Sequence, residues 1–182
     1  MFGLAGTWRV FSMANTAKAL KRLAAAALFA AMICVVTAYI FHVPICLNGR
    51  YIHFGDVFVF LAAAMLPKHY ALAAAVVGSG LADLLTAPVW ALPTLVVKVL
   101  IVLPFSAKGE RLLTRRNLLA SLLSAPVSCA VYYLAEALLF GNWIAPALDI
   151  PMGLIQYLGC PAAFILAALA LDKANIKRRV GC

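Results

Sequence analysis

Charged residues are scarce in this sequence, and acidic residues are the scarcest of them. Charged residues make up 12% of its 182 residues, and 6 are acidic against 15 basic, whereas a typical soluble domain is about 25% charged. Hydrophobic residues make up 66%, and the mean hydropathy is +1.02. A soluble domain of this size has too little interior to bury that much apolar surface. The composition therefore predicts a protein solvated by lipid, and it argues against a nucleic-acid-binding protein despite the net charge of +9.

Motifs of catalysis and metal binding are also lacking. The chain contains no HExxH, GxSxG or Walker sequence, so we expect neither an enzyme nor a subunit that hydrolyses ATP itself. Ser79 stands between Gly78 and Gly80, but no suitably placed histidine accompanies it, and these glycines favour tight helix packing instead. The five cysteines are odd in number and scattered, with no CxxC or Cys/His spacing. We therefore expect no cofactor, no metal site and no disulfide framework.

Six apolar segments predict an all-α integral membrane protein, with six transmembrane helices in a compact bundle. The first segment is longer than the 7–15 apolar residues of a signal peptide and is interpreted as a retained helix. The second to fourth fall below the roughly 20 residues of a perpendicular span. The predicted organisation is an N-terminal segment (1–22), a membrane domain (23–172) and a basic tail (173–182). The predicted helices are 23–41, 56–66, 70–85, 90–105, 118–140 and 151–171.

Basic residues predict the orientation of this bundle. The N-terminal segment, the loops after the second and fourth helices, and the tail hold 13 of the 15 lysines and arginines. Of the other two, Arg50 falls in the first outer loop and Lys98 within a helix. Cytoplasmic loops carry such an excess of positive charge. We therefore expect both termini in the cytoplasm.

Acidic residues follow the opposite distribution. Asp56, Asp83, Glu136 and Asp149 fall at or near the predicted outer ends of helices. Asp56 opens the second helix and Asp83 nearly closes the third, so their carboxylates can lie close together. Lys98 lies about two turns below the outer end of the fourth helix, roughly 12 Å at 1.5 Å per residue. Ionisable groups at that depth are costly and usually face a cavity or a partner.

Two interpretations of these ionisable groups stay open. Asp56 and Asp83 either cap helices in the headgroup layer or line a site. Lys98 either lines a ligand cavity or forms a structural ion pair with Glu136 or Asp83, and snorkelling is a third possibility. Glu136 lies one turn after Tyr132 on the same helical face. That spacing suits a wet pocket and a buried tyrosine–carboxylate bond equally.

Aromatic and histidine side chains give a weaker signal. Trp90 and Trp143 stand near predicted membrane surfaces, and an aromatic belt explains them better than ligand stacking does. His53 and His69 are interpreted as ordinary loop residues. Of the two, His53 is the better site candidate because of its neighbours in the sequence.

A stripe of alanines on the first helix predicts a docking surface. Ala26 and Ala30, like Ala27 and Ala31, are four residues apart and share a helical face. Small residues at this spacing allow a second helix to approach closely in lipid. The alternative is that alanine is simply common in this chain.

Five stretches in a fixed order resemble the substrate-binding S components of energy-coupling factor (ECF) vitamin transporters, in the riboflavin-type branch. In that family a Gly-Asp opens the second helix, a Gly-containing stretch with Ala-Asp closes the third, and a Pro followed by Thr and Lys lies on the fourth. The resemblance covers nearly the whole chain, and its weight lies in order and spacing. The stretches are 51–57 (YIHFGDV), 61–64 (LAAA), 67–68 (PK), 78–85 (GSGLADLL) and 92–98 (LPTLVVK).

The resemblance implies a small subunit of a prokaryotic plasma membrane that captures a vitamin or similar micronutrient at its outer face. A transmembrane coupling subunit and two ATPase subunits would complete the importer. Ala26, Ala27, Ala30 and Ala31 would contact the coupling subunit, and the loop 42–55 would cover the site. The resemblance does not identify the vitamin, because members share a scaffold and differ in pocket residues.

The outer position of the ionisable groups agrees with such a site. The alternative function is a standalone proton-coupled carrier or channel for a small solute, with Asp83, Lys98 and Glu136 as a proton relay. The candidate substrate-binding residues are Asn48, Arg50, Tyr51, His53, Asp56, Asp83, Trp90, Lys98, Tyr132, Glu136, Asn142, Trp143 and Gln156.

Overall fold

The described part of the chain is almost entirely helical, which confirms the predicted all-α class. The structure is a computed structural model that describes residues 4–40, 43–44 and 51–180. Two short strands pair in antiparallel fashion, Val43 with Ile52 and Pro44 with Tyr51. The elements are α1 (Leu4–Ala38), β1 (Val43–Pro44), β2 (Tyr51–Ile52), α2 (Gly55–Met65), α3 (Lys68–Thr86), the 3-10 helix η1 (Pro88–Trp90), α4 (Ala91–Val102), α5 (Arg115–Phe140), α6 (Ala145–Lys173) and α7 (Ile176–Val180).

Four described helices are long and apolar enough to cross a membrane. They are the 16–38 part of α1, together with α3, α5 and α6. The third predicted segment reaches this length because α3 begins two residues earlier than expected, directly after Pro67, and continues to Thr86. The stretches Gly55–Met65 and Pro88–Val102 are apolar but shorter. Six spans therefore stay a prediction for this chain.

The short helix α2 occupies the centre of the bundle. It packs against α1, α3, α4 and α6, and ten of its eleven residues are buried. A helix that is hydrophobic all round is expected to be buried in this way. Because protein rather than lipid surrounds α2, its length need not match the thickness of the bilayer.

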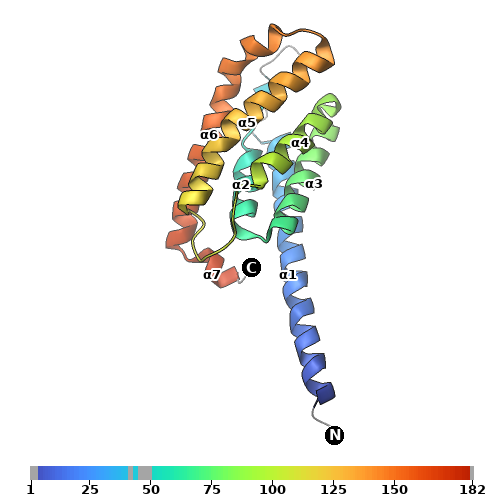
Figure 1. Cartoon of the computed structure of the whole chain (residues 1–182), viewed down its shortest axis with the longest axis vertical. Coiled ribbons are helices and arrows are strands. Elements are labelled where there is room, and N and C mark those ends of the chain that lie inside the picture. The colour runs from blue at the N-terminus through green and yellow to red at the C-terminus, as the bar shows by residue number, and fades with distance from the viewer. Residues whose placement is uncertain (1–3, 41–42, 45–50, 181–182) are drawn as a thin grey trace.

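Helices α1 and α3 approach each other unusually closely. A Cβ atom at Gly78 would lie 2.5 Å from the carbonyl oxygen of Ala30 and 2.9 Å from the Cβ of Ile33. Only a residue without a side chain permits this contact, so the packing role predicted for this glycine is confirmed. Figure 1 shows α1 running alongside α3 and then continuing past the end of the bundle toward the N-terminus.

The start of α6 corrects the predicted loop over residues 141–149. Gly141, at φ 65°, ends α5 in the left-handed conformation. The side-chain oxygen of Asn142 then accepts hydrogen bonds from the backbone N–H groups of Ile144 (2.9 Å) and Ala145 (3.2 Å). Pro146, in the first turn, needs no such partner. This capping starts α6 six residues before the predicted position, and Pro151 lies inside the helix.

Polar side chains secure the opposite end of the bundle, where α7 and the C-terminus lie (Figure 1). Asn117 is fully buried and bonds to the backbone of Ser106 and Leu112. The Asp172 carboxylate accepts hydrogen bonds from the N–H groups of Leu112 (2.7 Å) and Leu113 (3.0 Å). Hydrogen bonds thus fix residues 106, 112 and 113 of the loop between α4 and α5 to α5 and α6. We call the end of the bundle formed by this loop and α7 the basic end.

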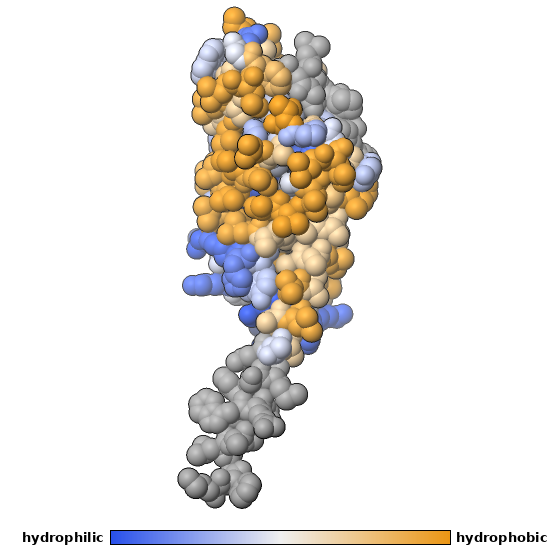
Figure 2. Space-filling model, turned by 90° about the vertical axis from the view of Figure 1, so that its right-hand side faces the viewer, coloured by the Kyte–Doolittle hydropathy of each residue, from blue (hydrophilic) through white to orange (hydrophobic). Residues whose placement is uncertain are grey.

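Large hydrophobic side chains are exposed along the helices. Leu138, Leu148 and Leu166 are each at least 70% exposed, and soluble monomers rarely expose contiguous apolar surface on this scale. Figure 2 shows hydrophobic residues covering the upper body on one face and hydrophilic residues gathered below them. This surface is that of a protein surrounded by lipid.

Candidate functional site

A pocket opens between β2 and helices α3 to α6. Its lining residues come from the last turn of α3, the first turn of α4, the second half of α5 and residues 153–157 of α6. These segments lie in the half of the bundle away from α7 (Figure 1). Half of its lining side chains are aromatic or imidazole rings, and the others supply hydroxyl, amide, carboxylate and small apolar groups. The lining residues are Tyr51, Ile52, His53, Asp83, Trp90, Thr94, Tyr132, Gly153, Gln156 and Tyr157.

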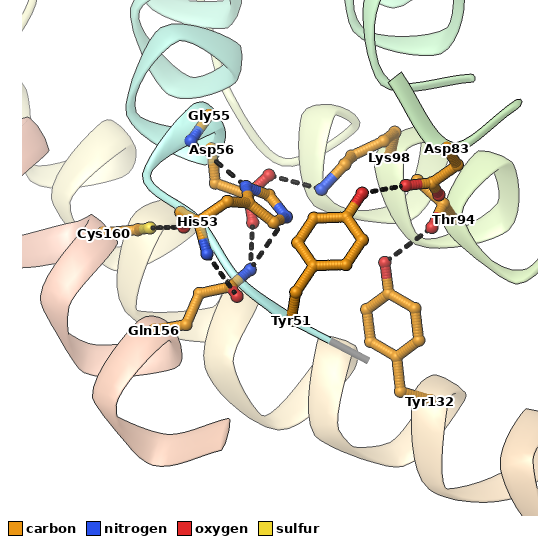
Figure 3. A network of polar contacts seen from close by, with 10 residues as sticks. All are labelled: Tyr51, His53, Gly55, Asp56, Asp83, Thr94, Lys98, Tyr132, Gln156 and Cys160. Carbon is orange, nitrogen blue, oxygen red and sulfur yellow. Dashed lines mark hydrogen bonds and ion pairs between the residues drawn. The ribbon is translucent and has the colours of Figure 1, made fainter. Parts of the chain in front are cut away.

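A buried ion pair lies beside this pocket. The Lys98 ammonium on α4 bonds to the Asp56 carboxylate in the first turn of α2. Lys98 is 1% exposed and does not line the pocket. Gln156 on α6 donates to the second oxygen of Asp56 at 3.5 Å. The pair therefore links three helices behind the pocket wall, and Lys98 reaches Asp56 rather than the pocket (Figure 3).

The segment before α2 is fixed by contacts of His53 and Gly55. The His53 N–H donates to the Gln156 side-chain oxygen at 3.2 Å, and Cys160 donates to the His53 carbonyl at 3.5 Å. The Gly55 N–H donates to Nδ1 of His53 at 3.1 Å. A Cβ atom at Gly55 would lie 1.9 Å from the Thr37 hydroxyl oxygen. Glycine before Asp56 thus lets the start of α2 pack directly on α1.

Tyr51 closes one side of the pocket. Its hydroxyl donates to Oδ1 of Asp83 at 2.5 Å and accepts from Thr86 at 3.3 Å. Burial and the neighbouring Asp83 carboxylate raise the pKa of Tyr51 well above its ordinary value. The phenol therefore stays protonated and acts as the donor. Figure 3 shows its ring between His53 and Asp83, across the pocket from Tyr132.

An aromatic wall faces Tyr51. Trp90 is 3% exposed and packs edge-on to Tyr132, with ring centroids 6.1 Å apart, and against Phe140 at 6.0 Å. Tyr132 and Thr94 share a hydrogen bond of 2.8 Å between their hydroxyls. Flat apolar surfaces with a few oriented polar groups are typical of small-molecule pockets.

The Asp83 carboxylate is the acidic group of this pocket wall. Its Oδ1 accepts from Tyr51, and its buried Oδ2 has no partner within ordinary hydrogen-bond distance among the described residues.

A comparison with protein-family models matches residues 17–173 to the S component of the ECF-type riboflavin transporter. The match includes every helix that lines the pocket. The chain belongs to this family. It is a membrane vitamin-binding subunit of an ECF transporter, and the family is not one of enzymes. No curated protein and no solved structure matches the chain.

The structure gathers six of the thirteen candidate residues of this S component around one pocket. Asp56 and Lys98 lie beside it, while Glu136 is buried in α5 outside the described lining. Asn142 caps α6, and Trp143 is 55% exposed on the turn before it. Asn48 and Arg50 lie outside the described residues. The six lining residues are Tyr51, His53, Asp83, Trp90, Tyr132 and Gln156.

Two of the sequence interpretations are corrected. Lys98 was interpreted as lining a ligand cavity or as pairing with Glu136 or Asp83, but its bonded partner is Asp56. The sequence does not predict this pair, because the two residues are far apart in the chain and only the folded bundle places α2 against α4. For Trp90 an interfacial belt was favoured over ligand stacking, yet the ring is buried against Tyr132. The η1 turn points its ring inward, which no periodicity of α4 predicts.

The four alanines of the predicted docking surface differ in exposure. Ala26 is 5% exposed and lies in the core of the bundle, and Ala30 is partly buried, with its backbone against Gly78. The docking role of these two alanines stays a prediction. Ala27 and Ala31 are exposed, and their docking role stays a prediction.

Sequence reasoning missed four lining residues, namely Ile52, Thr94, Gly153 and Tyr157. Thr94 lies four residues before Lys98 within the stretch 92–98 that carries the resemblance, so its position on the helix was available. Tyr157 directly follows Gln156, but α6 is apolar over most of its length. Nothing in its pattern distinguishes the pocket-facing side from the lipid-facing side.

Proposed function

We propose that this S component captures its vitamin at the outer face of the membrane and passes it inward through an ATP-driven complex. The observation that carries the proposal is the pocket itself, which lies at the end of the bundle opposite the basic end. Positive charge concentrates on the cytoplasmic side of membrane proteins. A pocket at the other end opens toward the outside.

Accessibility to a membrane-impermeant thiol reagent tests this orientation. Trp143, on the turn at the pocket end, and Arg115, at the first residue of α5 on the basic end, are both exposed. A cysteine in place of Trp143 should react in intact cells, and one in place of Arg115 should react only after lysis. The native cysteines are first replaced by serine or alanine. Labelling of position 115 alone would reverse the orientation.

Riboflavin is the proposed substrate. The Lys98 ammonium is engaged by Asp56, and the Asp83 carboxylate is the charged group of the pocket lining. A ligand carboxylate beside Asp83 would meet like charge, so an uncharged ligand with hydrogen-bond donors is favoured. Riboflavin carries an imide N–H, several hydroxyls and a planar ring that suits the wall of Trp90 and Tyr132. The family name agrees with this chemistry.

Energy for uptake comes, in this proposal, from a coupling subunit and two ATPase subunits. The chain has no ATP-binding motif of its own. The exposed Ala27 and Ala31 offer a close-approach surface on α1 for the coupling subunit.

Riboflavin binding by the purified subunit tests the substrate. Quenching of flavin fluorescence gives the affinity, and mass spectrometry identifies molecules that co-purify. Asp83→Asn keeps an acceptor for Tyr51 but removes the second carboxylate oxygen. It should weaken binding roughly 10- to 100-fold, the loss expected for a hydrogen bond to a charged group. Asp149→Asn, with the same chemical change outside the pocket lining, should leave affinity unchanged.

Transport separates the proposal from a proton-coupled carrier. Liposomes that contain the subunit alone, under a proton gradient, should show no uptake, and adding the coupling module with ATP should start it. Uptake driven by the gradient alone would refute the proposed function and favour the carrier.

A further inference from the structure

A second cavity lies at the basic end, about 490 Å³ in volume and distinct from the vitamin pocket. Its floor is apolar and is formed by the ends of α2 and α4. Leu66 is fully buried there and Phe105 is 1% exposed. The wall continues with Met65 and Val102. None of these residues lines the vitamin pocket.

Four cations surround this apolar floor, and they come from four segments of the chain. They are Arg22 on α1, Lys68 at the start of α3, Lys108 between α4 and α5, and Arg116 on α5. No aspartate or glutamate is among the described lining residues. The rim therefore has a uniform positive charge, although the four residues are far apart in sequence.

Backbone carbonyls hold two of these cations in place. Lys68 Nζ donates to the Leu103 carbonyl at 2.5 Å, and Arg116 Nε donates to the Pro104 carbonyl at 2.7 Å. Each bond uses one donor. An ammonium has three N–H donors and a guanidinium has five. The end of α4 thus orients both cations while most of their donors stay available to an anion.

We propose that this cavity binds an anionic phospholipid, with the phosphate of the headgroup on the cationic rim and the start of an acyl chain on the floor. Basic pockets between helices on the cytoplasmic side suit such headgroups. The cavity lies at the basic end, lined by residues that follow α2 and α4. Figure 2 shows hydrophilic residues gathered below the hydrophobic surface, at the level where lipid headgroups would lie. Free phosphate would satisfy the rim without using the apolar side chains that line the cavity.

Native mass spectrometry of the full-length subunit in detergent tests the site. The probes are phosphatidylglycerol and phosphatidylcholine with identical acyl chains, and glycerophosphoglycerol, which is phosphatidylglycerol without its acyl chains. We expect phosphatidylglycerol to bind at least tenfold more tightly than either of the others. Equal binding of phosphatidylcholine would refute the role of the rim, and equal binding of glycerophosphoglycerol would refute the role of the floor.

Variants locate the binding. Lys68→Gln with Arg116→Gln removes two exposed rim cations and should weaken phosphatidylglycerol binding about tenfold or more. Lys173→Gln with Arg178→Gln removes the same charge at the same end, outside the cavity, and should change binding less than twofold. Equal losses in the two double variants would overturn the proposal. Thermal melting, measured on all variants, reports whether each is folded.

Discussion

The buried Lys98–Asp56 pair allows the sharpest test of how this bundle is held together. Lys98→Met keeps most of the side-chain length but leaves the Asp56 carboxylate without its cation. Removing one partner of a buried ion pair costs about 3–5 kcal/mol, because the remaining charge stays desolvated. Lys98 is 1% exposed and Asp56 is 6% exposed, so water cannot replace the lost partner without opening the α2–α4 contact. We expect a loss of this size in the free energy of unfolding.

The second variant of the cycle is Asp56→Asn. Alone it strands the Lys98 ammonium and should be similarly destabilising. In combination with Lys98→Met it removes both charges, while the amide oxygen of Asn can still accept the hydrogen bond from Gln156. The double variant should therefore recover at least half of the loss of either single variant, and the coupling between the two sites should exceed about 1 kcal/mol.

Unfolding of the detergent-solubilised subunit by denaturant, together with thermal melting, measures these changes. Lys173→Met is the matched control, since Lys173 is exposed at the end of α6, and it should change stability by less than about 0.5 kcal/mol. Riboflavin affinity is measured on the same samples. A stable Lys98→Met variant with weakened affinity would refute the structural role and place Lys98 in contact with the ligand.

Three further variants test the packing. Gly78→Ala should cost about 1–3 kcal/mol of unfolding free energy by forcing α1 away from α3; Gly80→Ala, which meets only a flexible leucine at 3.1 Å, should cost less, and the reverse order would contradict the packing argument. Ala27→Trp should abolish assembly with the coupling subunit in pull-down and spare riboflavin binding, whereas Ala26→Trp should unfold the core; normal assembly of the Ala27 variant would remove that residue from the interface. Lys177→Met should release α7, because Lys177 donates to a backbone carbonyl of α2 at 2.9 Å; faster hydrogen exchange of residues 174–180 would show it, and unchanged exchange would refute it.

The sequence alone was enough to suggest the family, because each motif that carries the resemblance is a short stretch of the chain. Gly55 and Asp56, the glycines around Ser79, and the Pro-Thr-Lys stretch of α4 each lie within a few residues of one another. Their physical roles are contacts between helices: Gly55 and Gly78 pack on α1, and Lys98 pairs with Asp56 of α2. Short motifs of this kind can be recognised in the sequence without the structure.

The lengths of the helices were less well predicted, and capping explains why. The composition shows where apolar stretches lie, but a helix continues as long as its end groups find partners. Asn142 accepts from the backbone N–H groups of Ile144 and Ala145, where α6 begins six residues earlier than predicted. A single side-chain oxygen leaves no mark on hydropathy.

What the sequence determined by itself was the class of the protein: an apolar helical membrane protein, with its basic residues placed for one orientation and the stretches of an ECF S component in order. What only the tertiary structure decided was which groups meet. It paired Lys98 with Asp56, turned Trp90 inward and buried Ala26 while leaving Ala27 exposed. The reason is that helices in lipid are apolar on every side, so hydrophobic periodicity does not mark the inward face. Packing around α2 sets that face, and packing is a property of the whole bundle.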